Sequence, residues 1–351
     1  MTGALRVLGF AVAAAAVPSG CATLEYYAQA IGGQLEVIGR ARPIEERLRE
    51  SGLPQALRAR LERALAVREF ASRELALPDN GSYRSYADLE RPFVVWNVFA
   101  APEFSVKPVE SCFPVAGCVS YRGFFRETDA RAYAGSLRAQ GLDAHVGPVP
   151  AYSTLGWFDD PVLNTFIQYP DAELARLIFH ELGHQVAYAR GDTEFNESFA
   201  AAVEDEGVRR WLARHGTPEQ NSGYQTQQAR RREFVALIAR YRGRLASFYE
   251  EAHAVDDRRA GKARLFAGML EDYRSLKAGW GGFAGYDRFF SQGLNNALLA
   301  SATAYTRYLP AFRALLAEKG GDLCEFYVEV KRLARLDRKA RDARLKSLAR
   351  L

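Results

Sequence analysis

The residues best suited to chemistry form a short cluster in the middle of the chain. His180 and His184 lie four positions apart in a stretch, 172–189, that is predicted to be helical. Residues at this spacing share one face of a helix, so both imidazoles can reach the same metal ion. Glu181 is rotated by about 100° from that face, yet it is close enough to act as a general base on a water molecule. Because the pattern also arises by chance in helices, two core or surface histidines remain the alternative.

A third ligand is expected from the helix that follows. A catalytic zinc ion takes three protein ligands and leaves one position open. Glu197 lies thirteen residues after the second histidine and opens the predicted helix 197–215, so it is the expected third ligand. Asp192 and Glu194 compete for this role, but they lie in the connecting turn, where side chains are held less rigidly. Glu204 lies two turns further along the face of Glu197 and is expected to orient a ligand histidine.

Together these two segments resemble the gluzincin pattern of zinc peptidases. In gluzincins, two histidines and a downstream glutamate bind zinc, and the glutamate of the first motif is the general base. The resemblance therefore implies a Zn²⁺ ion, a peptide substrate and a mostly helical gluzincin-like catalytic domain. The residues that carry it are His180-Glu181-x-x-His184, Asn196-Glu197-Ser198-Phe199-Ala200 and Val203-Glu204.

A second resemblance spans nearly the whole chain. The sequence is similar to the bacterial family of predicted or putative aminopeptidases, whose members look like lipoproteins. This likeness rests on Gly20-Cys21, Tyr26-Tyr27-Ala28-Gln29-Ala30, Gly33-Gln34-Leu35, the segment Cys112-Phe113-Pro114-Val115-Ala116-Gly117-Cys118, Asn295-Asn296-Ala297 and Gly320-Gly321-Asp322. It implies an exopeptidase but leaves an endopeptidase open. An aminopeptidase needs an acidic group near the metal for the substrate's free amine, and Asp159 and Asp160 are the candidates, with solvated loop acids as the alternative.

Other residues have weaker assignments. Gluzincins often use a tyrosine or histidine to stabilise the oxyanion of the transition state. Tyr305 is the candidate here and Tyr308 a second one, although packing in the core is the alternative for both. The segment 152–168, which precedes the active helix, could bind an extended peptide by edge pairing. The three remaining histidines, His145, His215 and His253, are expected to be structural or to lie at the surface.

The first twenty residues have the composition of an export signal. They contain one charged side chain, Arg6, followed by an apolar run, 7–17, which is too short to cross a bilayer as a permanent helix. The run ends in small residues before Cys21, and this ending resembles a bacterial lipobox. We therefore expect Cys21 to be lipidated, and the mature chain to be tethered to a membrane of the cell envelope and to face the periplasm. The alternative is a secretory signal beside which Cys21 is incidental.

Three further cysteines remain. Cys112 and Cys118 flank a short turn-like segment, a spacing that suits a local disulfide in an oxidising compartment, with two buried thiols as the alternative. Cys324 lies in a predicted helix without an obvious partner and is expected to be buried. The chain contains no CxxC pair, which argues against a cysteine-rich zinc site.

The periodicity of apolar residues predicts an α+β protein with helices in the majority. Asp171 and Asn196 are the expected N-caps of the two active-site helices. Predicted strands are 93–99, 118–125 and 144–149, and the main predicted helices are 24–49, 54–75, 129–140, 219–255, 265–276, 293–308, 310–319 and 322–351. The expected organisation is a lipoprotein signal peptide over 1–20, an N-terminal helical segment over 21–80 and a catalytic domain over 81–351, with a small sheet in 90–170, active-site helices in 172–215 and further helices in 219–351.

Composition limits the class of protein further. The chain has 351 residues, 25% of them charged, and a formal net charge of +5, so it has ordinary globular composition. The basic residues are spread through helical stretches and no nucleic-acid motif is visible, so nucleic acid is not an expected partner. The leading hypothesis is a zinc-dependent aminopeptidase. The alternative is a membrane-anchored metal-binding or endopeptidase lipoprotein that acts in cell-envelope assembly or quality control.

Overall fold

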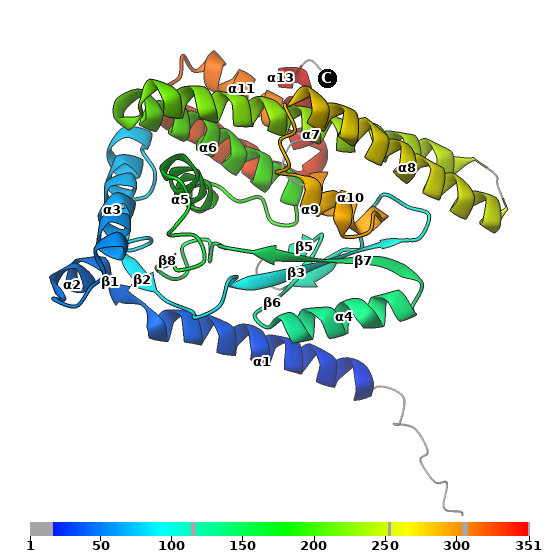
Figure 1. The fold of residues 1–351 in the computed structure, drawn as a ribbon, viewed down its shortest axis with the longest axis horizontal. Coiled ribbons are helices and arrows are strands. Elements are labelled where there is room, and N and C mark those ends of the chain that lie inside the picture. The colour runs from blue at the N-terminus through cyan, green and yellow to red at the C-terminus, as the bar shows by residue number, and fades with distance from the viewer. Residues whose placement is uncertain (1–16, 114–116, 252–253, 304–307, 350–351) are drawn as a thin grey trace, which may run out of the picture.

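Helices predominate in this protein, and small sheets of two or three strands lie among them. The computed structural model describes residues 17–113, 117–251, 254–303 and 308–349. Within these ranges the protein has the expected α+β fold, with most of its helices on one side of the strands (Figure 1). Among the described residues, no helix is both long and apolar enough to cross a membrane.

The N-terminal region is helical but is interrupted once. Helix α1 covers Val17–Arg40, strand β1 is Arg42–Pro43, and helix α2 is Ile44–Arg49. The prediction of one helix over 24–49 is therefore wrong, because Pro43 lacks a backbone N–H and the residue before a proline disfavours the helical conformation. Helix α3, Gln55–Leu75, begins directly after Pro54, as predicted.

Within the described residues, three small sheets lie among the helices (Figure 1). The central one has strand β3, Val95–Pro102, between β6, Arg122–Phe124, and β7, Leu142–Val149, with both pairs antiparallel. Helix α4, Glu127–Ala139, covers one face of it through a cluster that includes Trp96 and Leu137. Strands β4, Ser111–Phe113, and β5, Gly117–Val119, form a hairpin, so the predicted strand 118–125 is divided into β5 and β6. Strand β2, Ser85–Ala87, lies between β1 and β8, Val162–Leu163.

Two helices at the centre of the molecule carry the residues of the candidate site. Helix α5 is Asp171–Val186 and helix α6 is Thr193–His215. Both predicted N-caps are wrong. Asp171 is the first residue of its helix and forms an ion pair with Arg60, while Asp192 caps α6 by accepting a hydrogen bond from the backbone N–H of Phe195. Asn196 lies inside the first turn of α6.

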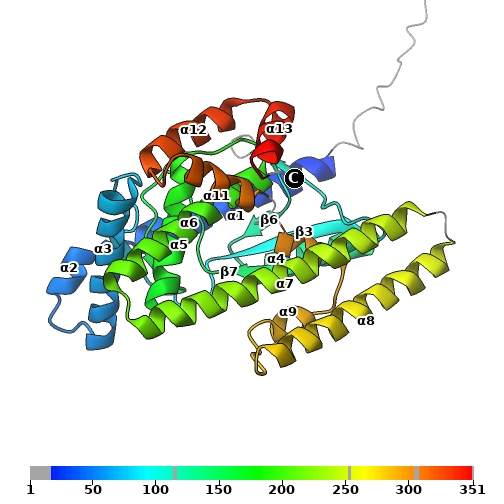
Figure 2. The ribbon, with the colours of Figure 1, turned by 90° about the horizontal axis from the view of Figure 1, so that it is seen from above.

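The C-terminal helices form a long arm and a compact group. Helices α7, Pro218–Glu250, and α8, Val255–Gly279, lie side by side and share an apolar cluster of their own (Figure 2). The remaining helices are α9, Asp287–Ser291, α10, Asn296–Thr303, α11, Leu309–Glu318, α12, Leu323–Arg335, and α13, Arg338–Ala349. The predicted helix 322–351 is thus divided near Leu336. Cys324 is exposed, not buried as expected, because it lies in the first turn of α12 on its outer side.

Candidate metal centre and the cavity around it

The close approach of α5 and α6 brings the site together. Gly183 faces α6, and a Cβ atom added there would lie 3.4 Å from the Cα atom of Ala200. The small residues Gly183 and Ala200 therefore let the two backbones approach each other closely. On this side both helices are largely buried. Their apolar side chains, such as Phe179 and Phe199, belong to a large buried apolar cluster that we call the main core.

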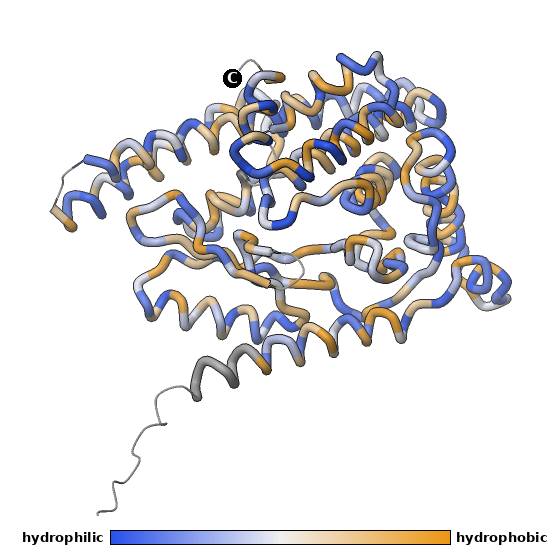
Figure 3. Tube along the Cα trace, turned by 180° about the vertical axis from the view of Figure 1, so that it is seen from behind, coloured by the Kyte–Doolittle hydropathy of each residue, from blue (hydrophilic) through white to orange (hydrophobic). Residues whose placement is uncertain are grey.

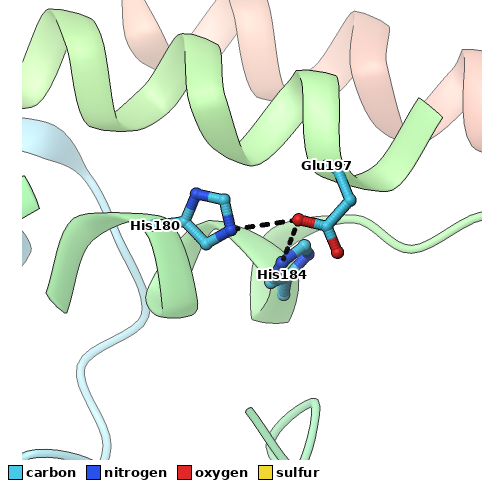
Figure 4. Close-up of side chains that lie close together, drawn as sticks. All are labelled: His180, His184 and Glu197. Atoms are coloured by element: carbon cyan, nitrogen blue, oxygen red, sulfur yellow. Dashed lines mark ion pairs between the residues drawn. The ribbon is translucent and has the colours of Figure 1, made fainter. Parts of the chain in front are cut away.

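Three side chains from these helices converge on one point. His180 and His184 lie on successive turns of α5, and Glu197 extends toward them from α6 (Figure 4). One carboxylate oxygen of Glu197 lies 3.3 Å from Nε2 of His180 and 3.8 Å from Nε2 of His184. One ligand atom from each of the three residues lies within 4.8 Å of the other two, and the three side chains are buried or nearly so.

This donor set fits a transition-metal ion such as zinc. Two atoms that are each bound at about 2.0–2.1 Å to a tetrahedral ion are about 3.3 Å apart. The separations of 3.3 and 3.8 Å are close to that value, and two imidazoles with one carboxylate match the ligand set of catalytic zinc sites. His180, His184 and Glu197 are therefore able to hold a metal ion.

Glu204 fixes the orientation of one of these histidines. It is fully buried on α6, and one of its oxygens lies 2.8 Å from Nδ1 of His180, on the ring side opposite Glu197. Arg176 donates to the same oxygen at 3.1 Å, and Arg231 donates to the other oxygen at 2.8 Å. These cations hold the pKa of Glu204 well below its usual range, although burial alone would raise it. Glu204 is therefore an anion that orients His180 by accepting its Nδ1 hydrogen.

His184 is held differently. Its Nδ1 atom is buried and has no hydrogen-bond partner among the described residues. Its ring packs edge to face against that of His180, with centroids 4.9 Å apart. Packing, rather than a second carboxylate, therefore sets the orientation of this imidazole.

Burial and neighbouring charge set the protonation of the cluster. Burial lowers the pKa of His184 to about 4, which keeps its imidazole neutral. Burial would raise the pKa of Glu197, but His184 and His180 hold it below its ordinary value. For Glu181, burial is the main cause that raises its pKa, to about 7. The site thus joins a neutral imidazole and a carboxylate, both of which suit a cation.

The turn before Glu197 is held by buried polar contacts. The side chain of Asn196 accepts a hydrogen bond from the backbone N–H of Ala189 at 2.7 Å and donates one to its carbonyl oxygen at 2.9 Å. The carboxylate of Asp192 caps α6 and also pairs with the buried Arg341 of α13 at 2.7 Å. Asn196 therefore locks the link between α5 and α6, and it acts one residue before Glu197.

A cavity of about 620 Å³ opens on this cluster. Apolar and aromatic side chains form most of its wall, and they come from α1, the β4–β5 hairpin, the loop after β5 and the segment that follows β7. Glu181, Glu197 and Glu204 are the only carboxylate residues in this lining, which is drawn from the described part of the chain. The aromatic residues of the wall are Tyr26, Phe113, Tyr121, Phe125, Tyr152 and Tyr188.

The structure locates the other predicted residues away from this cavity or outside the described ranges. Asp159 is exposed, and Asp160 is buried and accepts a hydrogen bond from the backbone N–H of Thr154, so neither lines the cavity. Tyr308 is buried in the main core, and its backbone N–H donates to Ser198 on α6. Asp192 serves as a helix cap and Glu194 does not line the cavity.

Three predicted residues lie where no side chain is described. Tyr305 and His253 lie outside the described residues, as does the signal-like run 7–16. Cys21 belongs to α1, but its side chain is not described. Of the other histidines, His145 stacks on Phe99 and His215 stacks on Trp211.

The two cysteines of the β4–β5 hairpin form a disulfide. Cys112 and Cys118 are directly opposed in the two strands and their sulfur atoms are bonded. The hairpin packs on the turn after α5, since a Cβ atom at Gly117 would lie 2.8 Å from the backbone nitrogen of Gly191. Its Phe113 and Val119 line the cavity, so the disulfide braces part of the cavity wall.

Sequence reasoning missed several residues of the site. Arg231 comes from α7 and Tyr121 from the loop between β5 and β6, both far from the two motifs in sequence. Burial raises the pKa of Tyr121, and the negative charge of Glu197 raises it further, so its phenol stays protonated near neutral pH. Nothing in the local pattern around either residue indicates its place in the cavity.

The fold and the site define a mostly helical α+β protein with a buried two-histidine, one-carboxylate cluster that could hold a metal ion beside a glutamate. Comparison with protein families gives a more specific assignment. The family model described as "Putative aminopeptidase" matches residues 25–345, and the chain belongs to that family. Searches of curated proteins and of solved structures found no match.

Proposed function

We propose that this protein is a zinc-dependent peptidase of the gluzincin type that hydrolyses peptide bonds in substrates bound in the 620 Å³ cavity. The observation that carries the proposal is the convergence of His180, His184 and Glu197 beside Glu181 within that cavity. Membership of the putative aminopeptidase family supports a peptidase and names an aminopeptidase as the expected kind.

Each residue of the cluster has a distinct role in this proposal. His180, His184 and Glu197 hold Zn²⁺, which, when bound, polarises the substrate's carbonyl group and makes water more acidic. Glu181 takes the proton from the attacking water and delivers it to the nitrogen of the departing amine. Glu204 keeps His180 in the tautomer whose Nε2 lone pair faces the metal, because its carboxylate accepts the hydrogen on Nδ1.

Hydrogen-bond donors near the cluster can stabilise the oxyanion. Tyr121 and Tyr188 line the cavity, and burial raises the pKa of both phenols. A protonated phenol donates a hydrogen bond, so either residue is suited to the role first assigned to Tyr305. Tyr305 remains a candidate from sequence alone.

The cavity wall indicates which substrates fit. Its aromatic and aliphatic side chains favour a large apolar side chain next to the scissile bond, since burying such a group contributes about 1.5–3 kcal/mol. Every carboxylate in the described lining either belongs to the cluster with Glu181 or supports it through a hydrogen bond. None of them remains to bind a free N-terminal amine. This observation supports the endopeptidase alternative, which the substrate screen below tests directly.

We also propose that the protein acts at a membrane. The apolar run 7–17 and the lipobox-like residues before Cys21 support a lipid anchor and a location in the bacterial cell envelope. A disulfide between Cys112 and Cys118 suits an oxidising compartment such as the periplasm.

A substrate screen tests the proposed function. The zinc-loaded chain would be given aminoacyl reporters with a free amine and internally quenched peptides with a blocked N-terminus, each in apolar, small and charged series. Release from apolar aminoacyl reporters alone identifies an aminopeptidase, and cleavage of blocked peptides identifies an endopeptidase. If neither series is cleaved by zinc-loaded protein, the peptidase proposal is wrong and the metal-binding alternative is favoured.

A further inference from the structure

An exposed apolar stripe follows the outer face of α1. Leu24, Ile31, Leu35 and Ile38 are 72%, 60%, 62% and 37% exposed, which is unusual for such side chains on one element. At about 100° per residue, these four positions fall within a sector of about 60°. They therefore form one continuous stripe along about four turns of helix. Helix α1 itself lies at the lower edge of the molecule in Figure 3.

The opposite face of the same helix is already occupied. Gly33 and Val37 are buried and lie about 170° and 130° around the helix from the centre of the stripe. Gln29 accepts a hydrogen bond from the backbone N–H of Phe125 at 3.0 Å, which joins this inner face to the protein. Helix α1 is thus apolar on two sides, and folding of this chain covers only one of them.

We propose that the stripe of Leu24, Ile31, Leu35 and Ile38 is a membrane-binding surface, and that α1 lies flat in the interface of a phospholipid bilayer. Interfacial helices bury an apolar face in the boundary between headgroups and acyl chains. Three observations favour a bilayer as the occupant, and they concern the preceding sequence, the residues that border the stripe and its area.

The stripe begins where the chain is expected to meet the membrane. The apolar run 7–17 and Cys21 directly precede Leu24, and α1 continues without interruption from Val17 to Arg40. An apolar segment or a lipid at this position would bring the first turns of α1 to the bilayer surface.

The residues that border the stripe suit the boundary between a membrane and water. The acidic residues Glu25 and Glu36 lie about 100–120° from Leu24 around the helix, outside the stripe. Glu36 forms ion pairs with Arg40 and Arg91 instead. Tyr27, which is half-buried, borders the other side, and tyrosine is a residue that places an apolar ring and a polar hydroxyl across a membrane boundary.

The area of the stripe argues against a second protein as the occupant. Four side chains with these exposures present on the order of 400 Å², about the size of the largest patch on a typical monomer. Stable protein complexes bury about 800 Å² on each partner. A bilayer has no such minimum, because its affinity grows with each apolar group that enters it.

Membrane binding through this stripe would bring the candidate metal centre close to the bilayer. Tyr26 and Ala30, on the protein-facing side of α1, line the cavity of that centre. One helix, about 10 Å across, would then separate the cavity from the bilayer surface. The site would consequently meet peptides that lie on the membrane or emerge from it.

Fluorescence from single positions tests the proposal on the full-length chain. An environment-sensitive fluorescent amino acid would replace Ile31 or Leu35, and, as the matched control, Val328, which is 64% exposed on α12 and isolated from the stripe. The protein would be reconstituted in vesicles of phosphatidylethanolamine and phosphatidylglycerol, with and without nitroxide-labelled lipids.

The proposal expects a blue shift at positions 31 and 35 and quenching by the nitroxide lipids that is at least several-fold stronger than at position 328. Equal, water-like emission at all three positions would overturn it. A blue shift at 31 and 35 without quenching by lipid would show that a second protein molecule covers the stripe, and would overturn it as well. The proposal rests on the membrane location proposed above, but neither outcome depends on peptidase activity, so the readout is independent of the proposed catalysis.

Discussion

Nδ1 of His180 lies 2.8 Å from the fully buried carboxylate of Glu204, while Nε2 of the same ring lies 3.3 Å from Glu197. The two carboxylates therefore contact opposite nitrogens of one imidazole. Glu204 fixes the tautomer and the orientation of the ring, and Glu197 lies with it at the candidate metal position. Such supporting carboxylates raise the affinity of a site for its metal.

The first prediction follows from that relationship. Glu204→Gln removes the charge that holds the Nδ1 hydrogen, so we expect a 10- to 100-fold loss of zinc affinity, measured by competition with a chromogenic chelator. Glu206→Gln is the matched control, since Glu206 lies on the same helix but pairs with Arg209 and Arg210. Equal zinc affinity in both variants, with intact folding by circular dichroism, would refute the role of Glu204.

The second prediction concerns the turn between the two helices. Asn196→Ala leaves the buried backbone N–H of Ala189 without its hydrogen-bond acceptor, which costs about 1–3 kcal/mol of the free energy of unfolding. Urea denaturation of the metal-free protein measures this loss. Asn221→Ala, which removes hydrogen bonds at the exposed start of α7, is expected to cost less. An Asn196→Ala protein as stable as the wild type would show that the turn does not depend on this side chain.

The third prediction compares two glycines of the α5–α6 region. A Cβ atom at Gly207 would lie 2.6 Å from the ring of Phe179 and 2.9 Å from Leu75, both fully buried, so Gly207→Ala should destabilise by about 1–3 kcal/mol. A Cβ atom at Gly183 would meet only ordinary contacts, from 3.4 Å outward, so Gly183→Ala should leave the free energy of unfolding nearly unchanged or slightly higher. The reverse order of stabilities in urea denaturation would contradict the observed helix packing.

The two histidines could be predicted from the sequence because helical periodicity places residues at a spacing of four on one face. Glu197 could be predicted because the turn around Gly191 lets the next helix return past the first. Helical periodicity also placed Glu204 seven residues beyond Glu197, on one side of α6. The identity of the cap of α6 could not be predicted, because Asp192 and Asn196 are both good capping residues and the choice depends on Arg341 and Ala189.

The surroundings of the cluster could not be predicted by local reasoning. Arg231 and Tyr121 reach the site only through the packing of α7 and of the loop after β5, and no periodicity encodes such contacts. In the fold, the α+β class and most helices after residue 171 were predicted, whereas the short helix α9, the first ten residues of α8 and the breaks at Pro43 and Leu336 were missed. Proline at position 43 was the available signal for the first break.

The fourth prediction concerns pH. Burial raises the pKa of Asp160 to about 6, above its value in the unfolded chain, so the folded state binds this proton more tightly. The resulting stabilisation is complete below pH 4 and is lost as the pH rises to about 6. Asp160→Asn does not titrate, so at pH 8 it should be more stable than the wild type by about 1–3 kcal/mol, and this advantage should shrink as the pH falls to 4. A difference that stays constant between pH 4 and 8 in thermal unfolding would show that this carboxyl is not buried as described.

The central claim, that Glu181 performs the proton transfers at a zinc site, is tested most directly by Glu181→Gln. Glutamine keeps the size and hydrogen bonding of the side chain but cannot take a proton, and loss of a general base typically lowers the rate about 100- to 10,000-fold. The measurement is kcat on the best substrate from the screen, together with zinc content and circular dichroism. We predict a folded variant with the zinc content of the wild type and a kcat lower by that factor. A zinc-loaded Glu181→Gln protein that cleaves at the wild-type rate would contradict the account.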